Sequence, residues 1–158
     1  MKKATLFYLL SLFLLGLFFE TSCKKYPNGP LLSLHSKEHR IVGTWIVDYY
    51  SINGYDSTSY LQGQPYYGKY TFYKRKPDGD DYAEFVLLDN NNIYVSDGHW
   101  FFTNNKKNID IDQSPLTQFY MNPYIARAIS WEIRRLTVSD LWLKTTYNGK
   151  EYFMKLKH

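Results

Sequence analysis

Hydrophobic and polar residues alternate along most of the chain after residue 41, and this period of two predicts β-strands rather than helices. Turn-prone residues separate the alternating segments, among them DNNN at 89–92 and the Asn148-Gly149 pair, a strong hairpin signal. We expect strands at residues 42–52, 68–76, 82–88, 93–96, 99–103, 108–112, 130–136, 141–147 and 150–157. This series predicts an all-β fold, a single antiparallel meander barrel of about eight to ten strands.

Three segments interrupt the alternation. Residues 36–41 favour one helical turn, and residues 53–68 favour a long loop because they contain glycines and a proline. Pro115 and Pro123 interrupt residues 113–129, where a helical turn, a loop and a short strand are alternatives.

Aromatic residues make up 19% of the chain, and such rings fit the pleated surface of a sheet. The alternation places these residues on the inner face of the barrel: Trp45, Val47, Tyr49, Tyr70, Phe72, Phe85, Leu87, Trp100, Phe102, Trp131, Ile133, Leu141, Leu143, Tyr152, Met154 and Leu156. They either fill a small barrel completely or line a cavity for one apolar or aromatic ligand. In a hollow barrel, we expect the ligand to contact Tyr49, Tyr70, Phe72 and Trp100.

The first 22 residues have the features of a secretory signal peptide. Two lysines precede an apolar run from Ala4 to Phe19, which is shorter than the about 20 apolar residues of a membrane-spanning helix. Removal of the signal leaves residues 23–158, the length of one domain.

Cys23, the only cysteine, follows directly, and the arrangement resembles a bacterial lipoprotein signal. Thr21 and Ser22 fit the two positions before such a cysteine, whereas Glu20 stands where this family usually has leucine. The resemblance implies cleavage before Cys23 and lipid attachment to its thiol, and more than one acyl chain gives stable anchoring. A free buried cysteine is the alternative interpretation.

Residues 23–35 are expected to form a flexible lipidated tether before a barrel domain at 36–158, because they contain two prolines, an Asn-Gly pair and no sustained period. Lys24 and Lys25 are suited to contact anionic head groups beside the anchor. Surface-exported lipoproteins of the Bacteroidetes type often carry acidic residues here, and this chain has none. We therefore expect a lipid-anchored protein of the bacterial outer membrane that faces the periplasm.

Gly43-Thr44-Trp45, at the start of the first predicted strand, resembles the glycine-x-tryptophan opening of the lipocalins. The closing hairpins of lipocalin-like lipoproteins of the Bacteroidetes are similar to the C-terminal pattern Ile133-x-x-Leu136-Thr137-x-x-x-Leu141-x-Leu143-Lys144 and Asn148-Gly149-Lys150-x-Tyr152. The resemblance implies that Trp45 closes one end of the barrel and that a late arginine, Arg134 or Arg135, covers it. The middle Thr-Asp-Tyr motif of lipocalins has no match, so the resemblance implies an architecture and no ligand class.

Candidate catalytic and metal-binding residues are few. Asp97 and His99 would need a third group to form an acid/base or metal site, and the spacing suggests none. Asp78, Asp80 and Asp81 lack the alternation and distal glutamate of an EF-hand, and therefore favour a solvated turn. The sequence contains no phosphate-binding loop, nucleophile elbow or paired-cysteine motif. We predict neither an enzyme nor a metal or cofactor site.

Two functions are compatible with these features. The formal net charge is only +4 and the basic run at 74–76 favours a solvated strand end, so we expect no nucleic-acid partner. We also expect a monomer. The first function is binding of a small hydrophobic ligand inside the barrel. The second is a solid barrel that contacts an envelope protein or glycan through its tyrosine-rich loop, which contains Tyr55, Tyr60, Tyr66 and Tyr67.

Overall fold

The computed structural model describes residues 26–29, 34–64, 67–74, 83–113 and 129–158, and it confirms the prediction of an antiparallel β-barrel. The described helices are both short, α2 (Lys37–Ile41) and α3 (Thr58–Gln62). The strands are β1 (Gly43–Ile52), β2 (Tyr55–Asp56), β3 (Gly68–Phe72), β4 (Ala83–Asp89), β5 (Tyr94–Thr103), β6 (Asn108–Gln113), β7 (Ile129–Leu136), β8 (Asp140–Tyr147) and β9 (Lys150–Lys157).

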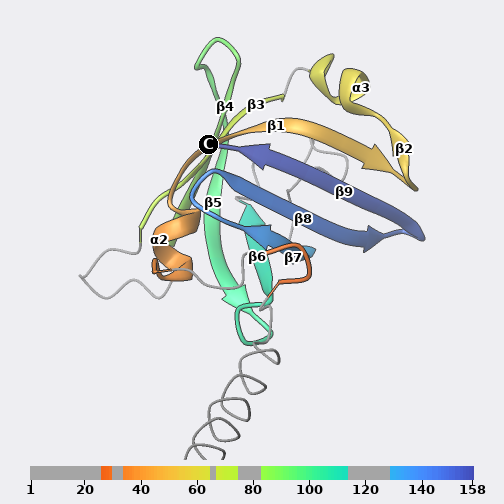
Figure 1. Cartoon of the computed structure of the whole chain (residues 1–158). Coiled ribbons are helices and arrows are strands. Elements are labelled where there is room, and N and C mark those ends of the chain that lie inside the picture. The colour runs from red at the N-terminus through yellow and green to blue at the C-terminus, as the bar shows by residue number, and fades with distance from the viewer. Residues whose placement is uncertain (1–25, 30–33, 65–66, 75–82, 114–128) are drawn as a thin grey trace, which may run out of the picture.

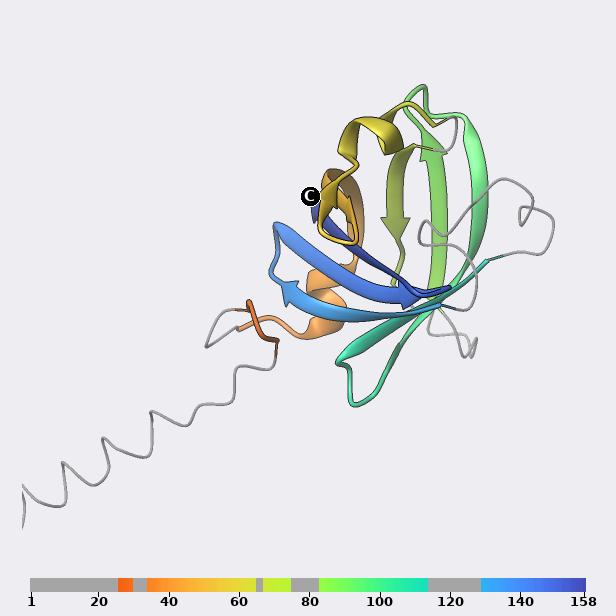
Figure 2. The ribbon, with the colours of Figure 1, turned by 90° about the vertical axis from the view of Figure 1, so that its right-hand side faces the viewer.

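These strands form one antiparallel sheet that closes on itself (Figures 1 and 2). From β3 to β9, strands that follow each other in sequence are also neighbours in the sheet, and β1 pairs with both β3 and β9. Strand β2 forms only a short hairpin with β1. The barrel therefore consists of β1 and β3–β9, and closure pairs each of these strands on both sides.

The antiparallel order assigns each turn to one of two ends of the barrel. Helix α2 leads into β1 at one end, where the β5–β6 turn at 104–107 and the β7–β8 turn at 137–139 also lie, and we call this end the base. Helix α3, the β4–β5 turn at 90–93 and the β8–β9 turn at 148–149 lie at the other end, which we call the mouth (Figure 2).

Strand β5 runs without interruption, although the sequence predicted two strands separated by a turn at Asp97-Gly98. Both residues pair with β4, and Gly98 also pairs with Gln113 of β6. Pairing of both residues with β4, and of Gly98 with β6, outweighs the local preference of Asp-Gly for a turn. Asp97 and His99 consequently lie in the middle of a strand.

Other predicted boundaries differ more modestly. Strand β3 ends at Phe72, before the predicted end at residue 76. The predicted loop at 53–68 contains β2 and α3, and α3 places Leu61 in the core. Residues 114–128 lie outside the described part of the chain, so the alternatives for that segment stay open.

The inner face of the barrel holds one hydrophobic core, most of which the alternation predicted. Of the residues predicted to face inward whose side chains are described, all except Tyr49 and Phe102 are buried. Burial of each large apolar side chain stabilises the fold by about 1.5–3 kcal/mol.

The prediction that Tyr49 faces inward is wrong, because Tyr50 takes the inner position. The register between β1 and β9 shifts between Val47 and Tyr49, as it does at a β-bulge. One extra residue reverses which side chains face inward, so Val47 and Tyr50 share the inner face. Tyr49 lies on the outside against Phe153, with ring centroids 6.3 Å apart.

Helix α2 closes the base and confirms the predicted helical turn. The Ser36 side chain caps its N-terminus by accepting a backbone hydrogen bond. The Trp45 indole N–H donates to the Ile41 carbonyl at 2.8 Å, and the Arg40 guanidinium donates to the Leu136 carbonyl at 2.6 Å. These two bonds tie the helix to β1 and β7.

Trp45 lies at the base, but the prediction that Arg134 or Arg135 covers it is wrong. The ring of His158 packs against Trp45 instead, with centroids 5.2 Å apart and an angle of 88° between the planes. Other residues occupy the inner positions of β7, so Arg135 lies on the outside, 5.3 Å from the centre of the Trp142 ring. Arg134 pairs with a glutamate of its own strand.

Tyr26, in the segment expected to be a flexible tether, packs against the base with 2% of its surface exposed. Its hydroxyl donates to the Lys106 carbonyl at 2.9 Å, and the Lys37 ammonium lies 4.8 Å from the centre of its ring. The Asn28 backbone N–H donates to the Arg134 carbonyl at 2.8 Å. This part of the expected tether belongs to the folded domain, so the prediction of flexibility is wrong here.

Candidate binding site inside the barrel

The interior of the barrel is buried from base to mouth, and the indole N–H groups of Trp45 and Trp100 in the base half donate to backbone carbonyls. The base half is packed with buried apolar and aromatic side chains: Ile41, Trp45, Phe72, Trp100, Leu136, Leu141 and Leu156. The mouth half adds polar atoms from residues that are each at most 8% exposed: Tyr50, Ser96, Trp131, Thr145 and Tyr152. A few polar groups on an otherwise apolar wall are typical of small-molecule sites. The mouth half is therefore the candidate binding site.

The strand registers explain where these polar residues lie. Ser96 is the third residue of β5, which begins at the mouth, whereas Trp131, the third residue of β7, lies deeper, opposite Ile109 of β6. Thr145 and Tyr152 pair with each other beside the β8–β9 turn, and the Thr145 hydroxyl donates to the Ser130 carbonyl at 3.0 Å. The order and register of the strands, rather than a local sequence motif, therefore decide where these polar side chains lie.

Two tyrosine rings form one wall of the mouth half. The rings of Tyr50 and Tyr152 are stacked, with centroids 6.4 Å apart and 23° between their planes. Burial, with a smaller contribution from Tyr147, raises the pKa of Tyr152 above its ordinary value. Its hydroxyl therefore remains protonated at neutral pH and retains a proton to donate.

Helix α3 is fixed beside this wall. The Thr58 hydroxyl accepts a hydrogen bond from the Tyr50 backbone N–H at 3.0 Å and lies 3.3 Å from the Tyr50 carbonyl oxygen, to which it donates. The Ser57 backbone N–H donates to the same carbonyl at 2.9 Å. Leu61 is fully buried against the core. The helix thus covers part of the mouth.

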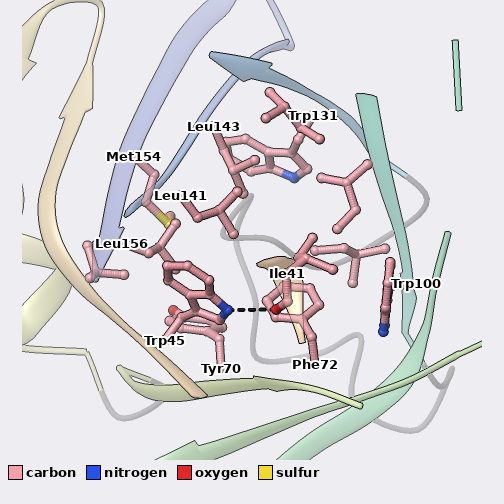
Figure 3. Close-up of a cluster of buried hydrophobic side chains, with 14 of the residues drawn as sticks. Ile41, Trp45, Tyr70, Phe72, Trp100, Trp131, Leu141, Leu143, Met154 and Leu156 are labelled. Atoms are coloured by element: carbon pink, nitrogen blue, oxygen red, sulfur yellow. Dashed lines mark hydrogen bonds between the residues drawn. The ribbon is translucent and has the colours of Figure 1, made fainter. Parts of the chain in front are cut away.

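The indole N–H of Trp131 is the most informative polar group of the interior. Trp131 is fully buried, and its Nε1 atom has no hydrogen-bond partner among the residues that the structure describes. Figure 3 shows this nitrogen turned toward the interior, across the barrel from Phe72. A buried donor without an acceptor costs about 1–3 kcal/mol, so this position favours a bound group that accepts a hydrogen bond.

The four residues predicted to contact a ligand do not gather at this site. Phe72 and Trp100 pack edge-on at the base, with ring centroids 5.9 Å apart, and Tyr70 pairs with Trp45 on the neighbouring strand (Figure 3). Tyr49 is outside the barrel. Three of the four therefore come together, but as part of the packed base half.

The outer position of Tyr49 belongs to a row of rings and cations across β1, β9, β8 and β7. The Lys155 ammonium lies 5.1 Å from the centre of the Tyr49 ring and 4.8 Å from that of the Trp142 ring. Arg135 covers the same Trp142 ring. Cation–π contacts of this kind account for these outward aromatics without a ligand.

A surface pocket of about 230 Å³ lies outside the barrel at the base. Its lining includes Ser36, Glu38 and His39 of the α2 region and Lys74 beyond β3. Its volume is below the range of about 300–1,000 Å³ that is usual for small-molecule sites. The pocket shares no residue with the mouth half and is not our candidate.

Asp97 and His99 are exposed on the outer face of β5. In the part of the chain that the structure describes, no group of three or more histidine, cysteine, aspartate or glutamate side chains is placed to hold a metal ion. Within that same part, no helix has both the length and the apolar character needed to cross a bilayer. Asp78, Asp80, Asp81, Cys23 and Tyr66 lie outside the described residues.

Comparison with known proteins does not assign this chain to a family. The chain matches no protein-family model, no curated protein and no solved structure.

Several residues of the site were missed by sequence reasoning, for different reasons. Thr145 shares a face with Leu141 and Leu143, so the alternation contained the signal for its inward position. Ser96 was placed in a strand expected to end there, and Tyr50 was displaced by the bulge. No periodic pattern marks a bulge before the partner strand is known.

Proposed function

We propose that this protein is a lipid-anchored, lipocalin-like envelope protein whose barrel binds a small, mostly apolar molecule in its mouth half. The observation that carries the ligand proposal is the buried Trp131 N–H, which lacks an acceptor among the described residues. Tyr50, Trp131 and Tyr152 belong to the same buried core as the base half, so the proposed ligand is a small molecule that packs among these side chains.

The chemistry of the mouth half defines the ligand class. Aromatic walls from Tyr50 and Tyr152 suit a planar or aliphatic body, because they present large apolar surfaces. Trp131 requires an acceptor such as a carbonyl, carboxylate or sulfonate oxygen. We therefore propose an apolar ligand with one acceptor group.

A fluorescent probe with this chemistry provides the first test. We would titrate the purified domain with 1-anilinonaphthalene-8-sulfonate and compare Trp131→Phe with Trp142→Phe, an outer tryptophan as matched control. A lost hydrogen bond to a charged acceptor costs about 1.5–3 kcal/mol, so Trp131→Phe should weaken binding about tenfold or more. Trp142→Phe should bind as the parent does. Equal affinities of the two variants, or no binding by the folded parent, would contradict the proposed site.

The membrane anchor rests on Cys23 and the preceding signal-like segment. If lipid is attached there, Cys23→Ala should move the protein from the membrane fraction to the soluble fraction, because the acyl chains are the anchor. A Cys23→Ala chain that remains with membranes after a carbonate wash would contradict this assignment.

A second candidate function is supported by the exposed tyrosines near the mouth. Tyr55 is 79% exposed and Tyr60 is 54% exposed, which suits contact with an envelope protein or glycan. In this case Tyr55→Ser with Tyr60→Ser should abolish partner capture, while Trp131→Phe should have no effect.

A further inference from the structure

The closed base of the barrel carries the segment that leads to Cys23. Tyr26 and Asn28 are held there by the hydrogen bonds described above, and the Arg135 guanidinium donates to the Asn28 carbonyl at 2.8 Å. The Lys37 ammonium donates to the Lys106 carbonyl at 3.0 Å, the same acceptor that receives the Tyr26 hydroxyl. The chain therefore leaves the folded domain at a fixed point of the base.

Only two residues separate this fixed point from Cys23. A fully extended chain advances by at most about 3.6 Å per residue, so the Cα atom of Cys23 lies within about 11 Å of that of Tyr26. An acyl chain on Cys23 must enter the bilayer from there. The anchor is too short to let the barrel turn its mouth toward the same membrane.

The charges at the two ends agree with this orientation. At the base, Lys74 and Lys107 are exposed, and Lys24 and Lys25 precede Tyr26 in the sequence. Basic residues close to a membrane surface are attracted to anionic head groups.

The rim of the mouth carries charges of both signs. Asp56 and Glu151 are exposed there and Asp89 lies at the β4–β5 turn, but Glu151 is paired with Lys144 and Lys150 is exposed beside the β8–β9 turn. This end therefore offers anionic head groups no excess of positive charge.

We infer that the base is the face that lies against the membrane, on an anionic phospholipid surface, so that the mouth opens away from the bilayer. This inference rests on the proposed lipid attachment to Cys23. It gives the anchored protein a fixed orientation in which the candidate site receives its ligand from the aqueous compartment and not from the lipid surface.

The test compares reporters at the two ends of the full, lipidated chain. Lipidation consumes the Cys23 thiol, so an introduced cysteine is the only free thiol. Val138→Cys places a fluorophore in the β7–β8 turn at the base, and Asn91→Cys places it in the β4–β5 turn at the mouth; both positions are exposed. Eight strand residues, tilted as in most barrels, separate the ends by about 20 Å along the axis.

The labelled proteins are reconstituted into phosphatidylcholine vesicles that contain phosphatidylglycerol and a headgroup spin-label quencher. We expect both to float with the vesicles and the Val138→Cys reporter to be quenched several-fold more than the Asn91→Cys reporter. Equal quenching, or stronger quenching at the mouth, would overturn the orientation. Flotation in that case would still support the lipid anchor. If neither protein floats, the anchor fails and the orientation fails with it.

A linker insertion provides the control. About 20 Gly/Ser residues between Lys25 and Tyr26 span about 25 Å on average, so they free the barrel from the anchor without altering the docked segment. The protein with the inserted linker should still float with the vesicles, and the difference in quenching between the two reporters should shrink. A difference that persists unchanged would show that the short connection does not set the orientation.

Discussion

The docking of Tyr26 at the base supports a quantitative prediction for Tyr26→Phe, which removes only the hydroxyl. That hydroxyl donates to the Lys106 carbonyl, but the Lys37 ammonium donates to the same carbonyl at 3.0 Å. The acceptor is therefore not left unsatisfied, and the loss is that of one ordinary hydrogen bond, about 1 kcal/mol. With a urea m-value of about 2 kcal/mol/M, the unfolding midpoint should fall by about 0.5 M.

Urea unfolding followed by tryptophan fluorescence measures this midpoint, with Tyr55→Phe as matched control. Tyr55 is 79% exposed, so loss of its hydroxyl should leave the midpoint unchanged. Amide exchange at Asn28 gives a local readout, because its N–H is bonded to the Arg134 carbonyl and should exchange faster in Tyr26→Phe. An unchanged midpoint together with unchanged exchange would refute the docking of this segment.

Three further predictions follow from the base and the bulge. Arg40→Met should lower the free energy of unfolding by about 2 kcal/mol, since it leaves the buried Leu136 carbonyl without its charged donor; calorimetry should show a fall of several degrees in Tm, and no fall would contradict the role of this bond. Tyr70→Ala should cost about 3–5 kcal/mol as a core truncation, and Tyr49→Ala much less, in parallel denaturant titrations; equal costs would show that the bulge is misplaced. Burial raises the pKa of Tyr26 above its ordinary value of 10.0, so its contribution is complete below about pH 10 and is lost as the pH rises toward the folded-state pKa. The stability difference between the parent and Tyr26→Phe should therefore shrink above pH 10 in unfolding titrations, and a constant difference would contradict this.

The fold was predictable because local signals and the barrel agree over most of the chain. The Asn148-Gly149 pair forms the β8–β9 turn, and the alternation of Leu141 and Leu143 with polar residues sets the inner face of β8. The failures arose where pairing with a neighbouring strand decides the outcome. Asp97 and Gly98 are part of β5 because both pair with β4 and Gly98 also pairs with β6, and the bulge in β1 places Tyr50 rather than Tyr49 on the inner face.

The candidate site was less predictable than the fold. The inward direction of Trp131 follows from alternation, but the isolation of its N–H depends on which side chains surround it in three dimensions. The docking of Tyr26 likewise arises from contacts with Lys37 and with the β5–β6 turn, and the turn is distant in sequence. A short segment with two prolines carries no periodic signal for such a contact.

The most direct test of a ligand-binding barrel is native mass spectrometry of the mature protein purified from its own host, compared with the same sample after denaturation. If the barrel binds a ligand, we expect a reproducible additional mass that is lost on denaturation and is reduced in Trp131→Phe. This mass should belong to a small apolar molecule with an acceptor group. A bare polypeptide mass under gentle conditions, for both the parent and the variant, would contradict the ligand proposal and favour the interaction module with exposed tyrosines.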